Sequence, residues 1–103
     1  MDRDPARAER DAERASRWLP WSSEALRLAG EAELAQGKRR QARATFVRAV
    51  EKDPLDWELW FDLAVASDGR ARVRAARRAE RLNPLAPQID EARAQLGLGT
   101  GRR

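Results

Sequence analysis

The feature that most constrains the fold is a spaced pattern of small, apolar and turn residues between Pro20 and Pro54, which lie 34 positions apart. Within this span a first apolar pattern ends at Gly37, and a second one, which contains Phe46, ends at the second proline. Glycine suits the left-handed conformation that closes a helix, and proline cannot continue one. The span therefore predicts two helices joined by a short turn, in a unit of 34 residues.

The next unit is a shortened form of the first. Its first helix runs through Trp60, Leu63 and Ala64, and Pro84 closes it after only 30 positions. The four missing residues fall at a turn over 67–69. Four residues are about one turn of helix at 3.6 residues per turn, so a hairpin shortened at its tip keeps the rest in register.

Further helices flank these two units. We expect one domain over residues 1–97, made of a lone second helix over 4–18, a full repeat over 22–53, a shortened repeat over 56–83 and a capping helix over 87–97, followed by a disordered tail over 98–103. In the shortened repeat Arg72 stands where Ala42 stands in the full one, which leaves the packing of that helix open. The predicted fold is all-α, with about six helices in an antiparallel helix-hairpin stack.

These units resemble tetratricopeptide repeats. The resemblance covers about residues 5–96 and rests on Leu26, Ala29 and Gly30 in the first helix, on Ala42, Phe46 and Ala49 in the second, and on the closing Pro54. The positions that are usually aromatic in the first helix are Glu33 and Ser67 here. The resemblance implies a right-handed superhelix that holds a partner protein, and an unrelated all-helical bundle is the alternative.

Composition sets the class of protein. The chain is 42% hydrophobic and 37% charged, which suits a soluble helical domain, and its apolar runs are far shorter than the roughly 20 residues of a membrane span. Its N-terminus is too charged for a signal peptide, so we expect a cytoplasmic protein or the soluble tail of a larger membrane protein. Without cysteine, the sequence does not indicate a redox compartment.

Catalysis is disfavoured because the usual groups are missing. The chain has no His, Cys or Tyr, so the ordinary metal ligands, the imidazole base and the thiol nucleophile are absent. Its serines lie at expected helix ends, where capping explains them, and its only lysines are Lys38 and Lys52. We therefore expect no enzymatic activity, no cofactor and no metal site.

Charge is divided between the two helices of each hairpin. The first helices are acidic, with Glu31 and Glu58 among their carboxylates, whereas the second helices are rich in arginine. In the family that the chain resembles, the first helices line a concave groove and the second helices form the convex back. That geometry implies an acidic groove and a basic outer surface.

The groove predicts a protein-interaction module that takes an extended or helical segment of a partner. The expected binding residues are Arg27, Glu31, Leu34, Glu58, Phe61, Asp62 and Val65. Phe61 has two interpretations, because a large aromatic side chain off the packing face is either a partner anchor or a contact with the capping helix around Ile89. The expected partner segment is basic, with apolar residues interspersed.

The arginines of the second helices support a different hypothesis, binding to an anionic polymer or to a membrane surface. The expected residues are Arg70, Arg74, Arg77, Arg78 and Arg81. No aromatic residues interleave these basic runs, which argues against a platform for single-stranded nucleic acid. Self-association is a further expectation, because the lone helix carries an apolar stripe from Ala8 to Ala15 with only one neighbour.

A second resemblance concerns the context of the chain. The segments WLPWSSEAL, KDPLDWELWFDLA and RLNPLAP are similar to the repeat tails of polytopic membrane proteins of the O-antigen ligase or polymerase type in actinobacteria. This resemblance implies a tail that recruits or positions an enzyme of cell-envelope glycan assembly.

Overall fold

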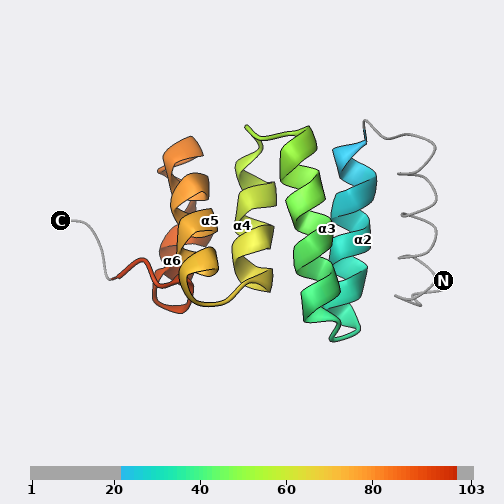
Figure 1. Cartoon of the computed structure of the whole chain (residues 1–103). Coiled ribbons are helices and arrows are strands. Elements are labelled where there is room, and N and C mark those ends of the chain that lie inside the picture. The colour runs from blue at the N-terminus through green and yellow to red at the C-terminus, as the bar shows by residue number, and fades with distance from the viewer. Residues whose placement is uncertain (1–21, 100–103) are drawn as a thin grey trace.

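The computed structural model describes residues 22–99, and this part of the chain is all-α, with five helices and no strand. The helices are α2 (Ser23–Ala35), α3 (Arg39–Lys52), α4 (Trp57–Ala66), α5 (Gly69–Leu82) and α6 (Pro87–Leu96). They stand side by side in chain order and alternate in direction (Figure 1). The predicted antiparallel helix-hairpin stack is thereby confirmed, while the expected helix over 4–18 lies outside the described residues.

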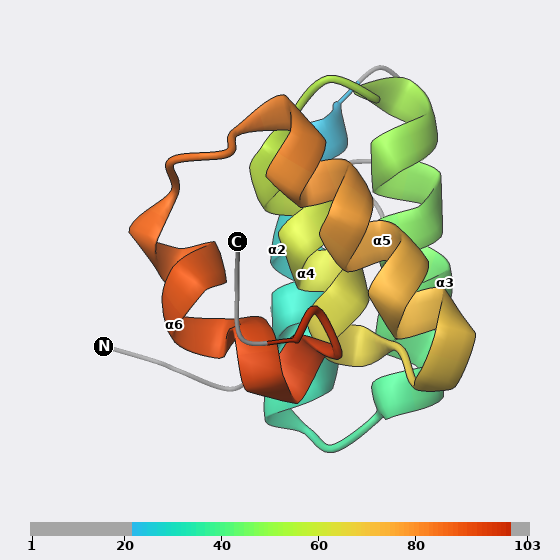
Figure 2. The same cartoon turned by 90° about the vertical axis from the view of Figure 1, so that its left-hand side faces the viewer.

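The two hairpins place their first and second helices on opposite sides of the stack. Figure 2 shows α3 and α5 on one side, α2 and α4 on the other, and α6 beyond α4 on that second side. None of the five described helices is both long and apolar enough to cross a membrane.

Short-range polar contacts explain where the helices begin and end. The Ser22 hydroxyl accepts a hydrogen bond from the Ala25 amide at 3.0 Å, and the Asp56 carboxylate accepts one from the Glu58 amide at the same distance. These side chains satisfy amides that have no partner within the first helical turn. At the other end of α2, Gly37 has a φ of 78°, the left-handed conformation that lets the chain reverse into α3.

The core of the first hairpin depends on one close approach. Phe46 on α3 is fully buried, and its ring lies against the backbone of Gly30 on α2. A Cβ atom at residue 30 would lie 2.6 Å from two ring carbons, which is too close for any real contact. Glycine at this position is therefore what allows a phenylalanine between the two helices.

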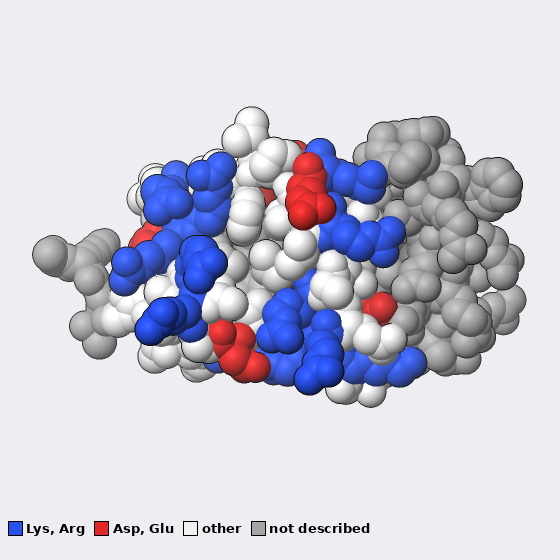
Figure 3. All heavy atoms as spheres, in the orientation of Figure 1, with Lys and Arg blue, Asp and Glu red and all other residues white. Residues whose placement is uncertain are grey.

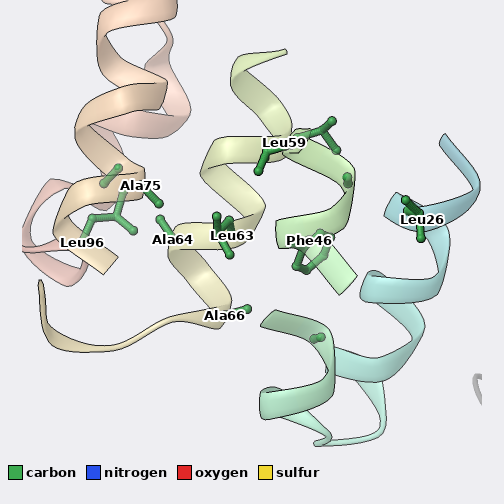
Figure 4. Close-up of a cluster of buried hydrophobic side chains, with 12 residues drawn as sticks. Leu26, Phe46, Leu59, Leu63, Ala64, Ala66, Ala75 and Leu96 are labelled. Carbon is green, nitrogen blue, oxygen red and sulfur yellow. The ribbon is translucent and has the colours of Figure 1, made fainter. Parts of the chain in front are cut away.

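One row of apolar side chains continues through all five helices. Leu26, Phe46, Leu63, Ala75 and Leu96 belong to a single buried cluster, which Figure 4 shows running from α2 to α6. Leu96 brings the capping helix into this row. The capping helix therefore closes the core of the second hairpin.

The second hairpin is shorter because α4 has 10 residues where α2 has 13, and its turn is one residue shorter. Two arginines bind this turn. Arg39 donates to the carbonyl oxygens of Val65 and Ser67, both at 3.0 Å, and Arg72 donates to the Ser67 carbonyl at 2.8 Å. Because carbonyls at a helix C-terminus have no partner inside the helix, these guanidinium groups take the place of a longer turn.

The sequence left open how α5 packs with an arginine at position 72, and the structure shows what this side chain does. Besides the turn, its guanidinium reaches the Gln95 carbonyl at the end of α6, at 2.9 Å. A small residue at this position, such as Ala42 in the first hairpin, has no side chain that could make either contact. Arg72 thus connects the turn of the second hairpin to the capping helix.

The contacts of the chain extend past Gly97 into the first two residues of the segment that the sequence assigns to a tail. Leu98 packs against the core clusters, and Arg93 donates to the carbonyls of Leu98 and Gly99, each at 3.3 Å. An apolar side chain and two bound carbonyls hold this segment in place. Residues 100–103 lie outside the described part of the chain.

Candidate partner-binding groove

The predicted groove residues occupy one face of each first helix. On α4, residues 58, 61, 62 and 65 follow one another at intervals of three or fewer and return to the same face within two turns. On α2, residues 27, 31 and 34 follow at intervals of four and three and likewise share one face. The two sets lie on neighbouring helices, on the side of the stack where α6 also stands (Figure 2).

Arg27 lies at the centre of the charged part of this face. Its guanidinium is 3.3 Å from the Glu31 carboxylate on the same helix, and 3.5 Å and 3.4 Å from the carboxylates of Glu58 and Asp62 on α4. The structure therefore brings together four of the seven predicted groove residues. One arginine offsets part of the negative charge of three carboxylates.

Asp62 is the most perturbed member of this cluster. Its pKa is raised from 3.8 to about 6, mainly by burial; the charge of Arg27 lowers the pKa, and the nearby carboxylates of Glu31, Glu58 and Asp56 raise it. Its Oδ2 atom makes no hydrogen bond within the described residues, because the guanidinium at 3.4 Å is poorly aligned with it. The charge of this carboxylate is therefore costly in the folded protein.

Arg27 shows the opposite balance. Burial lowers its pKa, but the charges of Asp62, Glu58 and Glu31 together raise it above the ordinary value. Since these carboxylates surround it from two helices, Arg27 stays charged at every accessible pH. The spacing of Arg27 and Glu31 is a signal that the sequence contains, whereas the approach of α4 is not visible in it.

Phe61 and Val65 form part of the wall of a pocket of about 490 Å³ between α4 and α6. The other lining residues come from three helices: Arg39, Arg72, Gln88, Glu91, Ala92, Gln95 and Leu96. Five of them belong to α6, which sequence reasoning treated as a cap rather than as part of the site. The spacing of Gln88, Glu91 and Gln95 along one helix face is a signal that could have identified them.

Both sequence interpretations of Phe61 have some structural basis. Its ring packs edge-on against Trp57, with a centroid distance of 6.1 Å, and it contacts both core clusters. It is nevertheless half-buried and faces the pocket that α6 completes. Leu34 is different, because it packs against the main core cluster and does not line this pocket.

The arginines of the alternative basic face lie mainly on the surface of α5. Arg70, Arg74, Arg77 and Arg81 are exposed, and the first three line a shallow pocket of about 670 Å³ against the end of α6. Arg78 is half-buried, and its guanidinium lies 5.6 Å from the centre of the Trp60 ring. Figure 3 shows basic side chains gathered over α5 and α3 on this side of the stack.

No cluster of His, Cys, Asp or Glu among residues 22–99 is arranged to hold a metal ion.

Comparison with known proteins supports the resemblance seen in the repeat pattern. Residues 23–66, which form α2, α3 and α4, match a family model described as "Tetratricopeptide repeat". No curated protein matches the chain. The match covers the full hairpin and the first helix of the shortened one, and proteins built from this repeat generally mediate protein–protein interaction.

Proposed function

We propose that this chain is a non-catalytic protein-interaction module that binds a partner segment across α2 and α4 and into the pocket beneath α6. The observation that carries the proposal is the pocket of about 490 Å³, which has Phe61 and Val65 on the same face of α4 as the charged cluster around Arg27. Pockets of this size with a few polar groups at the edge are typical of binding sites. The family match makes a protein the expected occupant.

The chemistry of the face indicates which segment it would take. The side chains of Glu31 and Glu58 are about half exposed, at 49% and 46%, so each can still meet a cation of the partner. Three carboxylates against one guanidinium leave the face acidic, which steers a basic segment toward it. An apolar side chain in the pocket would supply most of the affinity.

The short groove limits the strength of this interaction. Two hairpins and one capping helix offer a contact at the small end of specific interfaces. We therefore expect micromolar binding, equivalent to about −8 kcal/mol. Self-association that joined two grooves would increase the affinity.

The proposal is tested by crosslinking and capture from the native host, with two variants compared against the unmodified protein. The first variant combines Glu31→Lys, Glu58→Lys and Phe61→Ala, and it should lose the partners. The second replaces Arg70, Arg77 and Arg81 by Glu, and it should keep them, because these exposed residues line neither the groove pocket nor the face around Arg27. Circular dichroism melting curves of both variants establish that each is folded. Retention by the first variant and loss by the second would contradict the groove assignment.

Binding of an anionic polymer through the back of the stack is the second candidate. The observation in its favour is that Arg70, Arg74, Arg77 and Arg81 are exposed on one helix. Such binding depends on the release of counterions, so its affinity falls steeply with salt. A duplex oligonucleotide or an anionic vesicle whose binding disappears between low and moderate salt would support it. If partners bind with an affinity that changes little with salt concentration, the groove is favoured as the binding site.

A further inference from the structure

A further pocket, on the other side of α4 from the groove, has a volume of about 330 Å³. We call it the α3–α5 pocket. It lies between those two helices, and α4 forms its floor. The lining residues are Arg43, Val47, Val50 and Glu51 from α3, Trp60, Leu63 and Ser67 from α4, and Ala71, Arg74 and Ala75 from α5.

The inside of this pocket is mostly apolar. Val47 is 39% exposed, which is high for a valine with apolar neighbours, and it faces Trp60 and Leu63 across the pocket. Trp60 is held in place, because its indole N–H donates to the Pro54 carbonyl at 2.8 Å and Arg78 lies over its ring. The pocket therefore offers a preformed apolar surface that nothing in residues 22–99 covers.

The rim of the pocket is positively charged and unpaired. Arg43 and Arg74 lie on opposite sides of it, one on each flanking helix, and neither makes a hydrogen bond or ion pair with any described residue. Arg39 and Arg72 differ from them, since both bind the carbonyls of the α4–α5 turn. Figure 3 shows the same pattern, with basic groups over α3 and α5 and uncharged atoms between them.

Further arginines add positive charge to the same two helices without lining the pocket. Arg40, Arg48, Arg70, Arg77 and Arg81 are exposed there. Glu51 is the single carboxylate among the residues that line the pocket. The potential over an apolar pocket is therefore strongly positive, and an acidic ligand complements it.

We propose that the α3–α5 pocket docks an acidic amphipathic helix of a partner protein. One apolar side chain of that helix enters between Val47, Trp60 and Leu63, and carboxylates on the neighbouring turns pair with Arg43 and Arg74. The lining residues 43, 47, 50 and 51 extend over two turns of α3, which matches the apolar stripe of a helix laid into a groove. This surface goes beyond the proposed function, since it lies on the opposite side of α4 and selects the opposite charge.

The two properties of the site together favour a protein helix over a polyanion. A phosphate backbone would pair with the arginines but would leave the apolar pocket unfilled. A neutral apolar segment would fill the pocket but would leave the rim charges without partners. A helix that alternates carboxylates with an apolar stripe satisfies both.

The test uses a synthetic peptide of about 14 residues, roughly four helical turns, with leucines on one face and glutamates elsewhere. A control peptide has the same composition in an order that spreads the leucines around the helix. Two-dimensional proton–nitrogen NMR of the whole chain reports the site, because Trp60 lines the α3–α5 pocket whereas Trp57 does not and packs instead against Phe61, which lines the groove pocket. Trp60→Phe and Trp57→Phe variants assign these signals.

We expect the amphipathic peptide to bind with micromolar affinity and to shift the Trp60 signal but not the Trp57 signal. The control peptide should bind at least about tenfold more weakly, because apolar contact supplies most of the affinity. The double variant Arg43→Glu, Arg74→Glu should weaken binding by about tenfold or more. Its matched control is Arg48→Glu, Arg81→Glu, which changes one arginine on each of the same helices away from the pocket and should have a much smaller effect.

A neutral substitution keeps the test independent of charge and of folding defects. Val47→Gln replaces an apolar side chain of the pocket with a polar one at a partly exposed position. It should weaken peptide binding several-fold with little change in the melting curve. Equal binding of both peptides, an equal loss in both arginine pairs, or a shift of Trp57 instead of Trp60 would each overturn the proposal. So would a duplex oligonucleotide that binds as tightly as the peptide and shifts the same signal.

Discussion

The two hairpins of this protein follow the same repeat pattern but place different residues at the contact between their two helices. In the first, Gly30 lets the ring of Phe46 lie between α2 and α3. In the second, the corresponding positions hold Ala64 and Ala76, both buried in the same core cluster. The first pair combines the smallest residue with a large one, whereas the second uses two small ones.

The turns of the two hairpins differ in the same sense. The first turn contains Gly37 in a left-handed conformation and closes through backbone hydrogen bonds, such as that from the Lys38 amide to the Glu33 carbonyl at 2.8 Å. The shorter second turn relies on the side chains of Arg39 and Arg72. A repeat can therefore lose an aromatic core residue and about one turn of helix when side chains elsewhere replace the missing contacts.

The largest expected effect comes from removing the aromatic centre of the first hairpin. Phe46→Ala should lower the free energy of unfolding by about 3–5 kcal/mol, because Phe46 is fully buried and leaves a cavity. Phe61→Ala should cost much less, since Phe61 is half-buried beside a pocket. Urea unfolding followed by circular dichroism measures both. Equal costs would make Phe61 a core residue and remove it from the binding site.

Removing Arg72 should weaken the second hairpin. Arg72→Ala deletes charge-assisted hydrogen bonds to the Ser67 and Gln95 carbonyls, and we expect a loss of about 1.5–3 kcal/mol. Amide hydrogen exchange should show the loss of protection in α6 and in the turn, while α2 and α3 stay protected. Arg77→Ala, an exposed change on the same helix, serves as the control. Uniform loss of protection over all helices would mean that Arg72 has no special role in the second hairpin.

The first hairpin pairs a glycine with a phenylalanine where the second pairs two alanines, and this difference can be tested directly. Gly30→Ala should cost about 1–3 kcal/mol, because the new methyl group would collide with the Phe46 ring. In the Phe46→Ala background the same substitution should cost nothing or stabilise the protein, since the pair then matches Ala64 and Ala76. A double-mutant cycle of unfolding free energies measures this coupling. If the two free-energy changes simply add, residues 30 and 46 do not compensate for each other in volume.

The smallest expected effect concerns a difference between the outer faces of α2 and α4. Asp62 on α4 is half-buried with a pKa of about 6, whereas the corresponding residue on α2, Leu28, is uncharged and exposed. An acid whose pKa is higher in the folded than in the unfolded state binds its proton more tightly when folded. Its contribution to stability therefore falls as the pH rises from about 4 to about 6, and it stays low above that range.

Asp62→Asn removes this cost. The variant should be more stable than the unmodified protein by about 1–2 kcal/mol at neutral pH, with the advantage fading as the pH falls below 6 and absent below about 4. Thermal melts over this pH range measure the difference. A variant that is less stable at neutral pH would mean that the ion pair with Arg27 outweighs the burial of Asp62. Glu24→Gln, an exposed change on α2, is the matched control.

Local residue chemistry determined the helices and turns of this protein. Gly37, Asp56 and Pro87 act within one helical turn of themselves, so their effects can be deduced from the order of residues alone. The same holds for the division of charge, because each helix keeps its acidic or basic side whatever it packs against. The all-α stack was predictable for this reason.

Contacts between distant residues decided the rest. Arg27 meets Glu58 across 31 positions, and Arg72 meets Gln95 across 23, so neither contact has a trace in the local pattern. The role of α6 as a wall of the groove and the apolar pocket between α3 and α5 depend on how the helices stand against one another. Sequence spacing specifies which face of a helix a residue occupies, but the neighbour of that face, and hence its burial and charge balance, is set by packing in three dimensions.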